Sequence, residues 1–265
     1  MNKKDDENVS LPPNQGEGGD GGKLDALRDQ TPSSSPLVRG RSVEIVPAIL
    51  RTTYEKIAED WEKVARAARH IQIDVTDGIF AGEKSFLDIK RLEHLPASPA
   101  GDPPNGRIEL HMMVQTPAEY VEDIIDLNPA RCVFHIEAFL GTMDLPFVYN
   151  TIGEYTSAEM GIAINPDTNI DRLTEYLPIV QYVLFMGYTP GFAGQEINPN
   201  VFKKISDFHI AHPAITIAVD GHVDKATIPQ YAKAGASIFC SNTAIFGAGN
   251  PEENMKQLAL LAASA

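Results

Sequence analysis

The sequence predicts a (βα)8 barrel of the TIM type, preceded by a polar tail. Three observations predict this fold class. Eight short apolar or β-branched runs recur along the chain, and stretches with helical spacing alternate with them. The chain has 265 residues, enough for one such barrel, which takes about 250 residues. The runs are almost continuously apolar, as parallel strands buried on both faces are.

The runs and the helical stretches follow one another in a regular order. The expected strands are 43–49, 71–75, 107–113, 131–136, 160–164, 180–186, 214–219 and 236–240. The expected helices are 54–70, 116–127, 171–177, 199–209, 225–234 and 251–262, with weaker candidates at 85–93 and 145–157. Thr116 is a candidate N-cap, because Pro117 follows at the first helical position. A doubly wound sheet is the main alternative, and the absence of a GxGxxG turn after the first strand weakens it.

Residues 1–40 differ from the rest in composition. They are rich in Gly, Pro, Ser and charged residues, as in GEGGDGG and TPSSSP. Such a segment buries too little apolar surface to offset the entropy of ordering. The sequence therefore predicts a disordered tail over 1–40 and a barrel domain over 41–265. The Pro-rich stretch 94–106 is expected to be a surface loop.

Charge and composition exclude several classes of partner. The formal net charge of −14 repels nucleic acid and anionic lipid, so neither is expected as a partner. An anionic substrate would then need a metal or a group of backbone N–H donors. Cys132 and Cys240 lie in apolar runs and are expected to be reduced core residues. The charged N-terminus does not resemble a signal peptide, and no segment has the length of a membrane span, so the predicted location is cytoplasmic.

Polar residues gather where the expected strands end. Asp74, His111 and Asp220 lie near the ends of the second, third and seventh runs, and residues 135–137 (HIE) close the fourth. In this fold the carboxyl ends of the strands carry the chemistry. Alternation along a strand places Gln72 on the same side as Asp74. If that side is the lumen, two carboxylates and an imidazole converge, which suits a metal, a proton-transfer pair or both.

The loops after the last three strands are candidates for a phosphate site. Gly191 and Gly194 in the stretch TPGFAGQ allow close backbone approach to a ligand. Gly221 follows the seventh run, and residues 242–243 (Asn-Thr) follow the eighth. Loops after strands seven and eight form the usual phosphate site of this barrel. Backbone N–H groups at a helix start would hold the phosphate without a lysine or an arginine.

At this point seven motifs resemble the ribulose-phosphate 3-epimerase family. They occur in order from Val43 to the C-terminus: VPAIL (46–50), IDVTDG (73–78), ELHMMV (109–114), FHIEA (134–138), MGYTPGFAGQ (186–195), AVDG (218–221) and TAIFG (243–247). The resemblance implies interconversion of ribulose 5-phosphate and xylulose 5-phosphate, with close relatives acting on hexulose phosphates. It also implies two aspartates on opposite faces of the reacting carbon, and a divalent metal (zinc, iron, manganese or magnesium) that stabilises an enediolate.

The resemblance assigns roles to residues of this chain. Asp74 and Asp220 match the acid/base aspartates, which also bind the metal, and His111 matches a metal histidine. Met113 and Met186 match methionines that line the pocket around the enediolate. The residues that fall on the substrate- and phosphate-contacting loops are Gly191, Phe192, Ala193, Gly194, Gly221, His222, Asn242 and Thr243.

Departures from the family pattern cluster at the same site. Gln72 stands at the family's other metal histidine, where an amide oxygen is a weaker ligand for zinc, although a harder cation could still use it. Ala48 replaces a serine, His222 replaces a second glycine, and Thr76 replaces a pocket methionine. The metal is therefore expected to be weakly held or absent.

Three functions stay open from the sequence. The first is a sugar-phosphate epimerase with an altered metal site. The second is a barrel without this activity that binds a phosphorylated ligand or serves as a regulatory or scaffold protein. The third, a Schiff-base lyase or decarboxylase, ranks last because no expected strand contains a lysine. A small phosphorylated sugar is the expected partner, and a homo-oligomer is left open.

Overall fold

Eight parallel strands close into a barrel. The computed structural model describes residues 43–98, 101–140, 145–190 and 196–265, so the predicted tail over 1–40 lies outside the described residues. The strands pair in the order β1 to β8 and back to β1, which confirms the predicted (βα)8 barrel. Their bounds are β1 Glu44–Ile49, β2 Ile71–Thr76, β3 Ile108–Met113, β4 Arg131–His135, β5 Glu159–Ile164, β6 Tyr182–Met186, β7 Thr216–Asp220 and β8 Ile238–Ser241.

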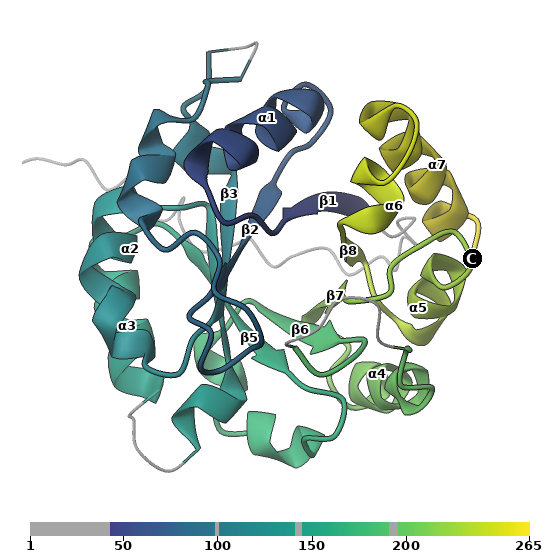
Figure 1. Ribbon diagram of the computed structural model, residues 1–265. Coiled ribbons are helices and arrows are strands. Elements are labelled where there is room, and N and C mark those ends of the chain that lie inside the picture. The colour runs from purple at the N-terminus through teal and green to yellow at the C-terminus, as the bar shows by residue number, and fades with distance from the viewer. Residues whose placement is uncertain (1–42, 99–100, 141–144, 191–195) are drawn as a thin grey trace, which may run out of the picture. The chain divides into compact units, whose positions relative to one another are not determined.

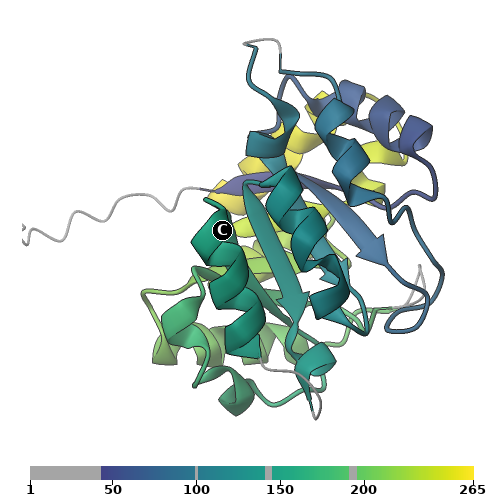
Figure 2. The same ribbon diagram turned by 90° about the vertical axis from the view of Figure 1, so that its left-hand side faces the viewer.

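Helices surround the strands on the outside of the barrel (Figure 1). The α-helices are α1 Tyr54–Val64, α2 Val121–Leu127, α3 Leu145–Tyr155, α4 Asn200–Ala211, α5 Ile228–Ala234, α6 Thr243–Phe246 and α7 Pro251–Ala263. The 3-10 helices are η1 Ile89–His94, η2 Pro104–Arg107, η3 Pro117–Tyr120, η4 Ile136–Phe139, η5 Ile170–Leu173 and η6 Leu177–Ile179. Seen from the side, the teal helices lie against the strands (Figure 2). Within the described ranges, no helix has the length and apolarity needed to cross a membrane.

Some expected helices take a tighter form than predicted. The stretch 171–177 is not an α-helix: η5 and the start of η6 form its two ends, with a turn at 174–176 between them. Pro178 explains this, because proline has no N–H to donate and disfavours helical backbone at the residue before it. The weaker candidate at 85–93 likewise forms only the 3-10 helix η1. The helix expected at 116–127 opens with η3, and Thr116 makes no side-chain cap.

The first helix is shorter than the sequence suggests. It begins after Thr53, whose side chain accepts a hydrogen bond from the backbone N–H of Lys56, and it ends at Val64 instead of at residue 70. The Arg107 guanidinium donates to the carbonyl oxygens of Ala65 and Ala68. Free carbonyls at a helix end need such a partner, so Arg107, from the loop before β3, holds the chain where α1 stops.

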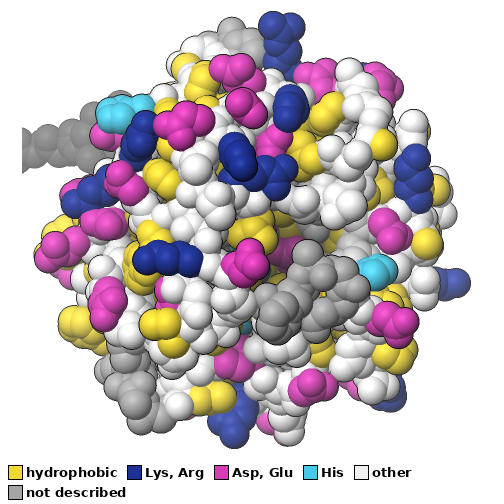
Figure 3. All heavy atoms as spheres, in the orientation of Figure 1, with side chains coloured by type: hydrophobic (Ala, Val, Ile, Leu, Met, Phe, Trp, Pro, Cys, Tyr) yellow, Lys and Arg dark blue, Asp and Glu magenta, His cyan; other side chains and the backbone are white. Residues whose placement is uncertain are grey.

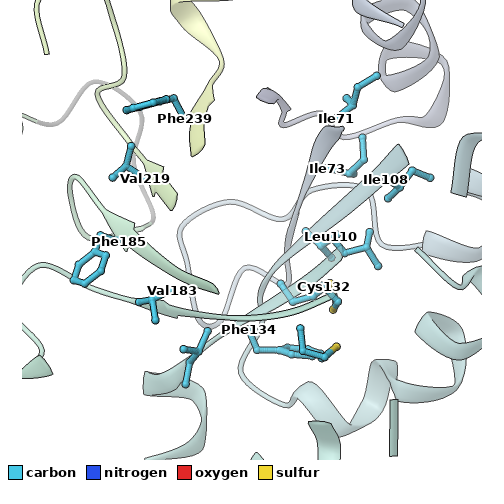
Figure 4. Close-up of a cluster of buried hydrophobic side chains, with 14 of the residues drawn as sticks. Ile71, Ile73, Ile108, Leu110, Cys132, Phe134, Val183, Phe185, Val219 and Phe239 are labelled. Atoms are coloured by element: carbon cyan, nitrogen blue, oxygen red, sulfur yellow. The ribbon is translucent and has the colours of Figure 1, made fainter. Parts of the chain in front are cut away.

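The main hydrophobic core lies between the strands and the helices. Alternate residues of six strands point outward into it (Figure 4): Ile71, Ile73, Ile108, Leu110, Cys132, Phe134, Val183, Phe185, Val219 and Phe239. Each is at most 1% exposed. Burying a side chain of this size contributes roughly 1.5–3 kcal/mol, so this layer holds the helices on the barrel. Cys132 belongs to it and Cys240 to the lumen, both as free thiols, as predicted.

The other set of alternate residues fills the lumen. A smaller apolar cluster occupies its middle and includes Val133, Leu184 and Ala218. At the amino-terminal end of the barrel, Arg131 forms ion pairs with Glu44, Glu109 and Glu159 at 3.0, 3.3 and 2.9 Å. These layers close the lumen from below. The polar residues at the opposite end therefore line a pocket that opens only at the carboxyl ends of the strands.

Candidate active site

Two aspartates and a histidine meet at the carboxyl end of the barrel. Asp74 lies on β2, His111 on β3 and Asp220 on β7, and one ligand atom from each lies within 4.8 Å of the others. Asp74 and His111 are register partners on adjacent strands. The predicted convergence of these three residues is confirmed. It follows from strand alternation, which points all three side chains into the lumen.

Gln72 lies beneath this group and joins its members. Its amide nitrogen donates to Asp74 Oδ1 and to Asp220 Oδ2, each at 2.7 Å, and lies 3.4 Å from His111 Nδ1. The side chain is completely buried. Its amide oxygen is also buried and has no hydrogen-bond partner among the described residues. The two carboxylates therefore orient the Gln72 amide. Its NH2 group faces them, because the amide oxygen in that position would be repelled by two negative charges.

The charge of His111 depends on the same carboxylates. Its Nδ1 lies 3.0 Å from Asp74 Oδ1 and 3.2 Å from Asp220 Oδ2. Burial lowers the pKa of His111, but hydrogen bonds to Asp220 and Asp74, together with their charges, outweigh it and raise the pKa to about 10. Burial, with the charge of Asp220, raises the pKa of Asp74. Without a cation, His111 is therefore protonated at neutral pH and holds the two carboxylates together.

The donor set fits a divalent cation. A catalytic metal site commonly keeps three protein ligands, and imidazole nitrogen and carboxylate oxygen are both usual donors. The unpartnered amide oxygen of Gln72 adds a fourth donor if the amide turns over, because this exchanges its nitrogen and oxygen. A cation bound there would displace the proton on His111 Nδ1. It would also take the place of the two hydrogen bonds that the Gln72 amide donates to the carboxylates.

This replacement predicts metal binding that strengthens as the pH rises. A cation bound to His111 Nδ1 displaces a proton whose pKa is about 10. One proton released per metal makes the apparent dissociation constant fall about tenfold per pH unit between about pH 6 and pH 8. Zinc titrations by calorimetry, in two buffers of different ionisation enthalpy, count the protons directly. A dissociation constant that does not change with pH would contradict a metal on His111.

A pocket of about 300 Å³ opens above the two aspartates. As predicted, Met113 and Met186 line it, together with Asp74, His111 and Asp220. Its other lining residues are Leu50, Thr76, Ala81, Glu83, Tyr188 and Pro190. Sequence reasoning gave no role to Leu50, Glu83 or Tyr188. Leu50 and Tyr188 lie inside the motifs VPAIL and MGYTPGFAGQ, and Glu83 lies in a loop whose course the strand pattern does not predict. The face that holds the pocket carries acidic and basic side chains side by side (Figure 3).

The residues predicted to bind phosphate occupy loops at the same end of the barrel. Gly221 and His222 both adopt positive φ, 95° and 56°. His222 therefore keeps the left-handed backbone that a glycine favours and adds an exposed imidazole. Asn242 and Thr243 begin α6, and the Asn242 side chain donates to the carbonyl of Ala48 at 2.7 Å. None of these four residues lines the pocket described above.

Two further predictions concern residues around that pocket. The positions 191–194 (Gly-Phe-Ala-Gly) lie outside the described residues, so their phosphate role stays a prediction. Ala48, which stands where the family pattern has a serine, is buried in the apolar cluster of the lumen. A serine hydroxyl in this cluster would need a hydrogen-bond partner.

Behind His111 lies a second histidine to which sequence reasoning gave no role. His135, at the end of β4, is fully buried, and its Nε2 lies 2.9 Å from His111 Nε2. Burial lowers the pKa of His135, although Glu137 opposes the effect. The ring is therefore neutral at neutral pH. The motif FHIEA was the available signal, because it places His135 and Glu137 at one strand end.

This chain is similar in sequence to one known protein family and to individual members of that family. The model of the ribulose-phosphate 3 epimerase family matches residues 44–246. A ribulose-phosphate 3-epimerase from Candida glabrata is 30% identical over 220 residues, covering 79% of this chain and 88% of the relative. One from Eremothecium gossypii is 29% identical over 215 residues, with the same shares covered.

Solved structures share the fold at low identity. KGPDC from Streptococcus mutans superposes with a TM-score of 0.63 at 11% identity, covering 83% of this chain and 97% of that one. At this identity the likeness concerns the fold alone. The family match spans all eight strands and includes Asp74, His111 and Asp220. The chain therefore belongs to the ribulose-phosphate 3-epimerase family.

Proposed function

We propose that this chain is a sugar-phosphate epimerase that interconverts ketose phosphates such as ribulose 5-phosphate and xylulose 5-phosphate. The observation that carries the proposal is the pair Asp74 and Asp220, held at one pocket by His111. Epimerisation next to a ketone needs one group that removes a proton and a second group that returns one on the opposite face. The pocket volume of about 300 Å³ is in the range of small-molecule sites.

The surroundings of Asp74 suit the role of the acid. Asp74 is 8% exposed, and burial with the charge of Asp220 raises its pKa, so it retains a proton more readily than an exposed aspartate does. In each direction of the reaction, one aspartate starts as the base and the other as the acid. Met113 and Met186 border the same space and exclude water from the reacting carbon.

Asp74, His111 and Asp220, with Gln72 as a fourth donor, are the residues that would hold a divalent metal. Such a metal, when bound, stabilises the negative charge of an enediolate. Gln72 and His111 orient both carboxylates from below, through contacts of 2.7–3.2 Å. The proposal includes the identity of the metal, which is one of zinc, iron, manganese and magnesium.

The test is an epimerase assay in deuterated water. Purified protein with ribulose 5-phosphate and added zinc or manganese should form xylulose 5-phosphate, with one solvent deuteron at the inverted carbon. Proton and carbon NMR follow both events. Absence of product and of deuterium, while the substrate still binds, would contradict the proposal.

A phosphate-ligand-binding barrel without turnover is the second candidate, and one observation favours it. The Gln72 amide nitrogen lies 2.7 Å from both carboxylates, a place that a cation would have to take. In that case the pocket would bind a sugar phosphate and release it chemically unchanged. The protein would then have a regulatory or scaffold role. The cytoplasmic location and the absence of nucleic-acid and membrane partners remain proposals in either case, and a homo-oligomer remains open.

A further inference from the structure

His111 is the first of three polar side chains that lead away from the pocket. Its Nε2 lies 2.9 Å from His135 Nε2, and His135 Nδ1 lies 3.5 Å from Glu137 Oε2. The two histidine ring centroids are 5.1 Å apart, with ring planes 19° from parallel. A 2.9 Å contact between ring atoms at this centroid distance means that the rings meet edge to edge. The nitrogens therefore face one another as donor and acceptor.

Glu137 is the third of these side chains and is fixed at the far end. Its Oε1 accepts hydrogen bonds from the backbone N–H of Asn165, at 2.9 Å, and from the Thr168 hydroxyl. Lys204 donates to the carbonyl oxygens of Asn165, at 2.7 Å, and of Thr168, and so holds the loop that carries both donors. Glu137 Oε1 therefore already accepts the hydrogen bonds of the loop that contains Asn165 and Thr168, and only Oε2 faces His135.

The proton order of the three side chains follows from these contacts. His135 Nδ1 and Glu137 Oε2 are both buried and lie 3.5 Å apart, and neither atom makes a hydrogen bond to any described residue. Their separation of 3.5 Å is long, but a carboxylate oxygen can only accept. The single proton of the neutral His135 ring therefore belongs on Nδ1. His135 Nε2 is then an acceptor and receives the proton on His111 Nε2.

We propose that His135 and Glu137 are positioning residues that fix the proton order of His111: they keep its Nε2 protonated, so that Nδ1 is the nitrogen that gives up its proton to a cation. The inference rests on the proposed metal site. Neither residue touches substrate or metal. Phe80 adds to the arrangement, since its ring packs on His135 with centroids 4.9 Å apart. Partners behind a metal-binding histidine commonly select the nitrogen that binds the metal.

Glu137→Gln is the variant that reverses this order without changing side-chain volume. The new amide oxygen must stay at the Asn165 N–H and the Thr168 hydroxyl, because an NH2 group there would face a backbone donor. The NH2 group then faces His135 Nδ1, which must become an acceptor. The proton of His135 moves to Nε2 and faces His111 Nε2. His111 retains its proton on Nδ1, where a cation would bind.

The experiment measures zinc affinity and the protonation of each ring. We expect Glu137→Gln to weaken zinc binding by about ten- to a hundredfold, the usual effect of residues that support a metal ligand. Competition with a coloured chelator measures the dissociation constant. Nitrogen-15 NMR of histidine-labelled protein should show His135 protonated on Nδ1 in the wild type and on Nε2 in the variant. An unchanged zinc affinity in the folded variant would overturn the proposal.

Glu44→Gln is the matched control. Glu44 Oε1 lies 2.5 Å from His70 Nδ1 at the opposite end of the barrel, so the control makes the same change at a second, partly buried Glu–His pair. It should leave zinc affinity unchanged. The wild-type spectrum decides the matter even if Glu137→Gln does not fold, because His135 protonated on Nε2 would overturn the proposal. If the wild type binds no zinc, the metal site itself fails, and that spectrum alone decides the proton order.

Discussion

Asp74→Asn and Asp220→Asn should each reduce epimerase turnover by about 10²- to 10⁴-fold, the usual contribution of a general acid or base. An amide at either position can neither take nor return a proton at the pH of the reaction. Both side chains line the pocket, and each contacts Gln72 at 2.7 Å. The measurement is the rate at which ribulose 5-phosphate is converted to xylulose 5-phosphate in deuterated solvent, followed by NMR.

Deuterium exchange in the same experiment also separates the two aspartates. If each serves one face of the carbon, a variant that has lost one carboxylate can still exchange the proton of one epimer with solvent, while inversion stops. Asp207→Asn is the control, because Asp207 is exposed on the outer helix α4, where its carboxylate pairs with Lys203 at 2.6 Å. It should retain nearly all activity. Full epimerisation by Asp74→Asn or Asp220→Asn would rule out the two-aspartate mechanism.

Gln72→His should increase zinc affinity by at least about tenfold, and epimerase rate should rise with metal content if metal limits turnover. Gln72 is completely buried on β2, directly below the two carboxylates. Its amide nitrogen is a hydrogen-bond donor to both and cannot bind a cation. An imidazole there presents a lone pair to the same point, which suits zinc better than an amide oxygen does.

Gln72→Asn is the control that separates two effects of Gln72→His. One is the gain of an imidazole ligand, and the other is the loss of the hydrogen bonds from the Gln72 amide to the two carboxylates. The shorter side chain withdraws its nitrogen from the carboxylates but supplies no imidazole, so zinc affinity should not rise. Metal content is measured by elemental analysis after dialysis, and rate by the same epimerase assay. A folded Gln72→His protein that gains neither metal nor activity would refute the weakened-epimerase interpretation. Metal without turnover would indicate that Ala48 and His222 obstruct catalysis, and would favour the ligand-binding barrel.

The sequence by itself determined the barrel and the positions of the residues that we propose as acid and base. All eight strands lie where the apolar runs predicted them, because parallel strands buried on both faces leave a strong local pattern. Alternation along β2, β3 and β7 then placed Asp74, His111 and Asp220 on the lumen side. Helix type was less predictable, as at 171–177, since a tight 3-10 turn and a short α-helix share the same apolar spacing over so few residues.

Only the tertiary structure decided what the buried polar atoms do. Gln72 and Asp220 are 148 residues apart in sequence, and closure of the barrel brings the amide nitrogen within 2.7 Å of the carboxylate. The pairing of His135 with His111 depends on the register between β3 and β4 and on side-chain rotation, which no sequence period reports. Sequence alternation predicts the side of a strand on which a residue lies. Hydrogen bonds depend on tenths of an ångström and on the direction of single protons, so they emerge only when all eight strands are in place.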